Sequence, residues 1–182
     1  MRALLILALV VLTAVQPAQA QTVRVVAITD FENISLDSGL IPSAHLSEVL
    51  RQLLQQQAGG QWRVIAGDSV RTAMRARGFT AQDLIYPSRA AEVAQAVGAE
   101  WVVTGRWTQL RFVSRSTPEP PSVRHGDALA IADVEVRVLE TSSRRRLMED
   151  RFSGRSVGGD LFSLLFAATE ALRGAATRIA RL

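Results

Sequence analysis

Two carboxylates end the first apolar run of the chain and are the residues best placed for acid–base chemistry. Asp30 and Glu32 alternate after the β-branched segment at residues 23–28, so both can project from one side of a strand end. General acid–base catalysis would need a raised carboxyl pKa, which the spacing does not supply. We interpret the pair as a solvated strand end that can contact a partner.

Three consecutive arginines, Arg144, Arg145 and Arg146, form the second candidate site. They follow the polar residues 141–143 between two strand-like segments, a pattern typical of a hairpin turn. Guanidinium groups in this position can bind phosphate or another anionic component of a cell envelope. The sequence is compatible with two interpretations of this hairpin, a solvated turn without a partner and a turn that binds an anionic partner.

Other common kinds of catalytic or metal site are not predicted. The only histidines are His45 and His125, and there is no cysteine, so a zinc-type cluster is not expected. The sequence also lacks a Gly-x-Ser-x-Gly elbow, and without lysine it cannot form a phosphate loop of the Gly-Lys type. We therefore expect no catalytic residues, no metal and no cofactor, and the protein is not predicted to be an enzyme.

The first twenty residues are typical of a secretory signal peptide. Arg2 precedes an apolar run at residues 3–15, and Ala18 and Ala20 stand at the −3 and −1 positions of a cleavage site before Gln21. The run is shorter than the roughly 20 residues of a transmembrane helix. We expect a periplasmic mature chain, residues 21–182, that forms one α/β domain with no transmembrane segment.

The charge of the chain bears on nucleic-acid binding, and its lack of cysteine bears on disulfides and lipid anchoring. All 21 basic residues are arginine, which explains a sequence pI near 11, yet the formal net charge is only +4. Such a small net charge does not predict nucleic-acid binding. Without cysteine, neither a disulfide nor the usual lipid anchor of bacterial lipoproteins is expected.

The hydrophobic pattern predicts an α/β fold with the element order β-α-β-α-α-β-β-β-α. Such an order predicts a mixed sheet of about five strands with helices packed on it. A polar, proline-rich stretch at residues 114–127 is expected to be an exposed loop. The expected strands cover residues 23–28, 62–66, 101–112, 130–139 and 147–156, and the expected helices begin near residues 43, 68, 88 and 160.

Periodic apolar residues predict which helix faces are buried. Asp68, Ser88 and Asp160 are expected to cap the second, third and last helices. For the first helix, the expected apolar stripe is Leu46, Val49, Leu50, Leu53 and Leu54, opposite Glu48, Arg51, Gln52 and Gln55. For the last helix, it is Leu161, Leu165, Ala168, Leu172, Ala175, Ile179 and Leu182.

Four short phrases of the sequence resemble those of a group of bacterial envelope proteins. They are Ile28 to Asn33 (ITDFEN), Gly98 to Gly105 (GAEWVVTG), Asp133 to Thr141 (DVEVRVLET) and Phe152 to Ser156 (FSGRS). The group includes the curli-secretion channel CsgG, the penicillin-binding-protein activator LpoB and the N-terminal domain of TolB. The fourth phrase, followed by a long helix, is most similar to small secreted members of the group.

The resemblance implies a non-catalytic module that binds other periplasmic or outer-membrane proteins in envelope assembly or regulation. It implies no cofactor and supplies no catalytic residues. It leaves the oligomeric state open, and the polar 114–127 stretch does not favour a membrane pore. The alternative is a periplasmic small-ligand or glycan-binding protein with its pocket near Asp30, Glu32 and the 114–127 loop.

Overall fold

The computed structural model describes residues 23–35, 40–57, 60–114 and 128–182. The predicted signal peptide, His125 and nearly all of the predicted 114–127 loop lie outside the described residues. The described part contains a six-stranded mixed sheet with helices packed on it, so the predicted α/β class is confirmed.

Three strands form the parallel part of the sheet, and three long strands form an antiparallel meander. The sheet order is β3-β1-β4-β5-β6; β1 is parallel to β3 and β4, whereas β4, β5 and β6 are antiparallel. A short strand, β2, pairs in parallel with β4 and was not predicted from the sequence. The strands are β1 (Arg24–Ile28), β2 (Glu32–Asn33), β3 (Trp62–Val64), β4 (Trp101–Ser114), β5 (Ala128–Glu140) and β6 (Arg146–Val157).

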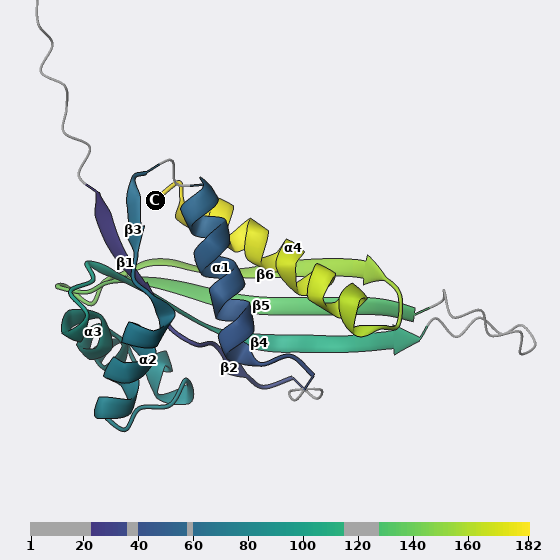
Figure 1. Cartoon of the computed structure of the whole chain (residues 1–182), viewed down its shortest axis with the longest axis horizontal. Helices are drawn as coiled ribbons and strands as arrows, with labels where there is room; N and C mark the ends of the chain where they lie inside the picture. The colour runs from purple at the N-terminus through teal and green to yellow at the C-terminus, as the bar shows by residue number, and fades with distance from the viewer. Residues whose placement is uncertain (1–22, 36–39, 58–59, 115–127) are drawn as a thin grey trace, which may run out of the picture.

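The helices lie on both faces of the sheet but do not cover them equally. Two long helices, α1 and α4, pack on one face, and the shorter α2, η1 and α3 lie near the β1 end of the other face (Figure 1). The helices are α1 (Ser43–Gln57), α2 (Gly67–Ala76), the 3-10 helix η1 (Gln82–Ile85), α3 (Pro87–Ala96) and α4 (Leu161–Ile179). Their order agrees with the predicted one.

Strand β1, which lies between β3 and β4, is buried on both faces. Because side chains alternate along a strand, Val26 and Ile28 enter the core beneath α1 and α4, while Val25 and Ala27 enter the core beneath α2 and α3. This double burial explains why the segment is a continuous apolar run rather than an alternating one.

The predicted apolar stripe of α4 is partly wrong. Leu164 is fully buried, whereas Leu165 is only half-buried and Leu161 is 48% exposed. The reason is a close approach between α4 and β6. A Cβ at Gly154 would lie 1.8 Å from the carbonyl oxygen of Ala167, so the helix backbone rests directly on the strand at this glycine. The alanines of α4 therefore face the sheet. Leu164 is buried beside them, and Leu161 and Leu165 are turned towards solvent.

One of the three predicted helix caps is confirmed. The Asp160 carboxylate accepts a hydrogen bond from the Ser163 amide at 2.8 Å, as an N-cap should. The other two were each placed two residues too late, since the N-caps of α2 and α3 are Ala66 and Tyr86. Asp68 lies inside the first turn of α2, and Ser88 follows Pro87 inside α3.

Candidate functional site

Asp30 lies just after the carboxyl end of β1. The connection from β1 to β3 contains α1 on one face of the sheet, and the connection from β3 to β4 contains α2 and α3 on the other face. The carboxyl end of a parallel strand at such a point is a usual ligand position in α/β proteins. The Asp30 side chain is 18% exposed, and its Oδ1 lies 3.3 Å from Arg71 Nη1 and 4.0 Å from Arg51 Nη2. The structure thus brings a predicted site residue together with two arginines that the sequence did not connect to it.

Arg51 is buried, which corrects its predicted place on the polar face of the first helix. Only 2% of the residue is exposed, and its guanidinium donates hydrogen bonds to the carbonyl of Ile28 and to Glu48. A Cβ at Gly67 would lie 2.6 Å from Arg51 Nη1, so the start of α2 closes directly over this group. The helical periodicity could not show this burial, because it is the approach of α2 that covers this side of α1.

The charges around Asp30 form a chain of ion pairs. Arg71 bridges Asp30 and Asp68, whose Oδ1 lies 2.6 Å from Arg71 Nη2. The hydrogen bond and the charge of Arg71 lower the pKa of Asp68, and the same hydrogen bond raises the pKa of Arg71. Both shifts favour the charged forms, whereas a general acid needs a raised carboxyl pKa. The geometry favours a network that fixes α1 and α2 at the end of β1.

Glu32 lies in different surroundings from Asp30. It belongs to β2, where it stands in register with Arg106 of β4, and its half-buried side chain has an Oε2 without a hydrogen-bond partner in the described part of the chain. Among the described residues, no hydrogen bond or ion pair joins Glu32 to the ion pairs around Asp30. The role of both residues in partner binding stays a prediction.

Arg144, Arg145 and Arg146 are exposed in the hairpin between β5 and β6. Arg144 has a left-handed backbone with φ of 58°, which is unusual for a residue other than glycine. Arg145 lies 3.7 Å from Glu140, and Arg146 pairs with Glu149. The predicted hairpin is confirmed, and the predicted partner contact is not tested by this geometry.

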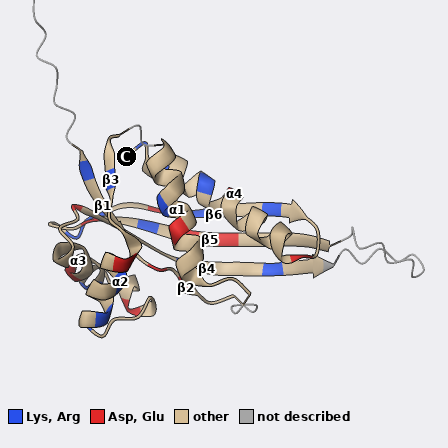
Figure 2. Ribbon diagram, in the orientation of Figure 1, with Lys and Arg blue, Asp and Glu red and all other residues tan. Residues whose placement is uncertain are grey.

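The sheet register creates a charged surface that the sequence analysis missed. On the face opposite α1 and α4, arginines of β4 and β6 flank carboxylates of β5. We call this surface the arginine face, and Figure 2 colours the basic and acidic positions along β4, β5 and β6. Its members are Arg106, Arg111, Arg137, Arg146, Arg151 and Arg155, with Asp133, Glu135 and Glu149. Only the alternation within residues 133–138 was visible in the sequence; strand pairing supplies the rest.

Asp133 is the buried centre of the arginine face. It is 5% exposed, and its two oxygens lie 3.2 Å from Arg151 Nη2 and 3.1 Å from Arg155 Nη1. Burial by itself would raise the pKa of Asp133. The hydrogen bonds from Ser153 and Arg155 and the charges of both arginines outweigh burial and hold the pKa below its ordinary value. The carboxylate therefore stays charged and positions the two guanidinium groups.

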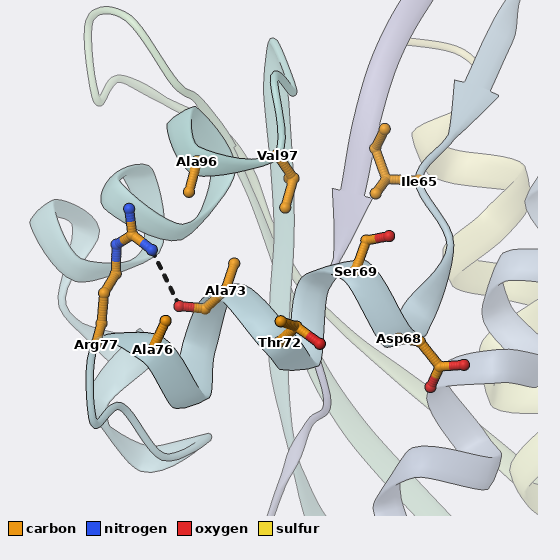
Figure 3. Close-up of a pocket in the computed structure, with 9 residues that line it drawn as sticks. All are labelled: Ile65, Asp68, Ser69, Thr72, Ala73, Ala76, Arg77, Ala96 and Val97. Carbon is orange, nitrogen blue, oxygen red and sulfur yellow. Dashed lines mark hydrogen bonds between the residues drawn. The ribbon is translucent and has the colours of Figure 1, made fainter.

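An open groove lies between α2, α3 and the end of β3 (Figure 3). Its volume is about 670 Å³, and small side chains such as Ser69, Thr72 and Ala73 line most of it. Arg77 lines one end of the groove and donates a 3.1 Å hydrogen bond to the carbonyl of Ala73. Asp68 belongs both to this groove and to the ion pairs around Asp30, so one end of the groove lies beside Asp30, whereas Glu32 does not line it.

Two kinds of site are not found in the described residues. Within them, no group of three or more histidine, cysteine or acidic residues is arranged to hold a metal ion. His45 is an exposed residue of α1. In the same part of the chain, no helix combines the length and the apolar character needed to cross a bilayer.

No protein-family model and no curated protein sequence matches the chain. Several solved structures do. Escherichia coli LpoB is 17% identical with a TM-score of 0.51, over 74% of this chain and 56% of the LpoB chain. The lipoprotein GNA1162 from Neisseria meningitidis is 13% identical with a TM-score of 0.57, over 87% of this chain and 99% of the other. The fold is LpoB-like.

The likeness extends to the protein CT253 from Chlamydia trachomatis, which is 16% identical with a TM-score of 0.52 over 86% of this chain and 95% of the other. At these identities the matches establish the fold alone. They confirm the LpoB part of the expected resemblance at the level of fold, over little more than half of the LpoB chain. The resemblance to CsgG and to TolB stays a prediction.

Proposed function

We propose that the protein is a non-catalytic interaction module of the bacterial periplasm that binds other envelope proteins during assembly or regulation. The observation that carries the proposal is the arginine face. One face of β4, β5 and β6 is closed by α1 and α4, whereas the other presents ordered, ion-paired side chains to solvent. The LpoB-like fold and the lipoprotein GNA1162 as a structural neighbour support an envelope role.

The electrostatics of the two charged clusters support a binding role rather than catalysis. Asp68 and Asp133 both have lowered pKa values and arginine partners, so they stay ionised and committed to ion pairs. A catalytic carboxyl group acting as a general acid needs the opposite shift. Groups of this kind hold a surface in one shape, which lowers the entropy cost of binding a partner.

The proposed location follows from the predicted signal peptide. We expect the exported chain to begin at Gln21 and to leave cells with the periplasmic fraction after osmotic shock. N-terminal sequencing of the purified protein checks this expectation. Retention of Met1, or a chain that stays with membranes after a salt wash, would contradict it.

Photo-crosslinking in intact cells tests the interaction role. A photoreactive side chain is placed at Ser153 on the arginine face, at Thr72 in the α2–α3 groove or at Gln52 on the exposed side of α1. We expect light-dependent protein adducts at Ser153, and Gln52 serves as the control for random encounters. The absence of protein adducts from every position would overturn the proposed function.

The second candidate is a small-ligand or glycan-binding protein, and the α2–α3 groove is the observation in its favour. Titration with soluble peptidoglycan fragments, followed by amide NMR, checks it. Saturable shifts at Ser69 and Thr72, together with no protein adducts in the crosslinking experiment, would replace the interaction role by ligand binding.

A further inference from the structure

The arginine face carries an excess of positive charge at defined positions. Six arginines of β4, β5 and β6 lie on this surface with three carboxylates of β5 and β6, and Glu32 of β2, in register with Arg106, adds a fourth. Arg151 and Arg155 share the single carboxylate of Asp133, and Arg111 makes no ion pair within the described residues. The cluster therefore lacks the negative charge needed to neutralise it from within the described chain.

The arginines of this surface keep unused hydrogen-bond donors. Arg155 contacts Asp133 through Nη1 alone, and Arg151 contacts it through Nη2 alone. A guanidinium group has five N–H donors in a fixed plane, and two of them match the oxygens of one further carboxylate. Arg151 and Arg155 are 51% and 47% exposed in their side chains, so these donors can be reached.

An apolar end adjoins the charges. Arg111, Ile131 and Arg155 stand in one row across the three strands, and the next row contains Leu129 and Val157. Ile131 and Leu129 are half-buried, and Val157 is 71% exposed. Within the described residues, the ion-paired Arg155 and the unpaired Arg111 thus lie next to an exposed aliphatic patch.

The described helices leave this part of the sheet uncovered. Residues of η1 lie beside Arg106 and Arg137, and α3 reaches only the Val102 and Leu139 end of the same face. Beyond the row of Arg106, no helix of the described part lies over the face, although the opposite face is closed along the same strands by α4.

We infer that the arginine face docks an acidic protein surface whose carboxylates pair with Arg111, Arg151 and Arg155 and whose apolar side chains cover Val157. This inference rests on the proposed function and names the chemistry of its partner. Two features favour a protein over an anionic membrane or a uniform polyanion. Glu135 and Glu149 lie between the arginines and repel a continuous negative surface, and the aliphatic end requires a partner with apolar side chains.

A defined probe tests the inference on the full exported chain. The probe is a labelled amphipathic peptide with glutamates on one helix face and leucines on the other, and its lysine counterpart is the negative probe. We expect the acidic peptide to bind, to shift amide signals of β5 and β6 around Ser153 and Arg155, and to lose affinity with added salt.

Charge reversal at Arg111→Glu together with Arg155→Glu should weaken binding about tenfold or more. The matched control is Arg173→Glu with Arg181→Glu, which makes the same charge change at exposed residues of α4 and of the turn after it and should leave binding within about twofold of wild type. Arg111→Gln is the milder variant, which should weaken binding measurably without placing a new carboxylate beside Asp133.

Every outcome decides the inference. Equal loss in the control pair, peptide shifts confined to α4, or tighter binding to phosphatidylglycerol vesicles than to the peptide would overturn it. If the peptide fails while crosslinks at Thr72 still capture proteins, this inference fails and the proposed function stands. If no position captures a protein, the proposed function itself fails.

Discussion

Replacing Asp133 by asparagine tests whether a buried carboxylate holds the arginine face in place. The substitution preserves size but exchanges one acceptor oxygen for an amide donor that faces a guanidinium group. Buried charge-assisted hydrogen bonds are worth about 1.5–3 kcal/mol each. Because Arg151 and Arg155 are half exposed, water replaces part of what is lost, and we expect a total cost of about 1–3 kcal/mol.

The pH dependence gives the prediction a second, independent readout. The pKa of Asp133 is below its ordinary value of 3.8, so its contribution to stability is complete above that pH and is lost as the pH falls through the lowered pKa. In urea unfolding, the difference between wild type and Asp133→Asn should therefore be largest near neutral pH and shrink in strong acid.

Glu149→Gln is the matched control, because it removes one carboxylate from the same face at a more exposed position. We expect it to cost about 1 kcal/mol or less. An Asp133→Asn variant as stable as wild type at neutral pH, or a stability difference that grows in acid, would refute the reasoning. Loss of peptide binding at full stability would instead show that Asp133 positions the arginines without stabilising the fold.

Four further substitutions test the packing and the backbone strain, with Arg144→Ala as a control for the last. Leu164→Ala should cost about 2–5 kcal/mol. Leu165→Ala should cost only about 1–2 kcal/mol, because that side chain is half-buried. If both leucine variants lowered the Tm equally, α4 would present a different face to the sheet from the one described. Gly67→Ala should cost about 1–3 kcal/mol by pushing the Arg51 guanidinium away from its buried contacts, and an unchanged urea midpoint would contradict this close packing. Arg144→Gly should stabilise the hairpin by up to about 1 kcal/mol, because glycine adopts a positive φ without strain; a gain of the same size in Arg144→Ala would argue against this cause.

The sequence was sufficient to predict the order of the elements, since each carries a local pattern. Continuous apolar residues mark β1, alternation marks β5, and glycines with positive φ end α2 and α3 at Gly78 and Gly98. It was not sufficient for β2, because two residues are too short to show a period. It was right for Ala168, Leu172, Ala175 and Ile179 of α4 but wrong for Leu161 and Leu165, because the contact between Gly154 and Ala167 that sets the buried face lies outside any local pattern.

The candidate sites were harder to predict than the elements, because the ion-pair partners of a charged residue lie far from it in the sequence. Asp30 could be selected from the sequence as a candidate, but its ion-pair partners Arg51 and Arg71 come from two helices farther along the chain. Glu32 was expected beside Asp30 and lies on a separate strand instead. Periodicity predicts on which face of its own helix or strand a residue lies. The register of the sheet and the packing of the helices determine which other residues contact that face.

The two faces of the meander differ in a way that bears on function. Beneath α4, β5 and β6 offer Ala130, Ala132 and Gly154, whose small size allows the helix backbone to touch the strand. On the other face, the long side chains of Arg111 and Arg155 flank Ile131 and would hold a helix farther from the strands. A helix packed there like α4 would remove these guanidinium groups from water, at a high desolvation cost for Arg111, which makes no ion pair among the described residues. We therefore expect the surface that covers this face to bring its own carboxylates.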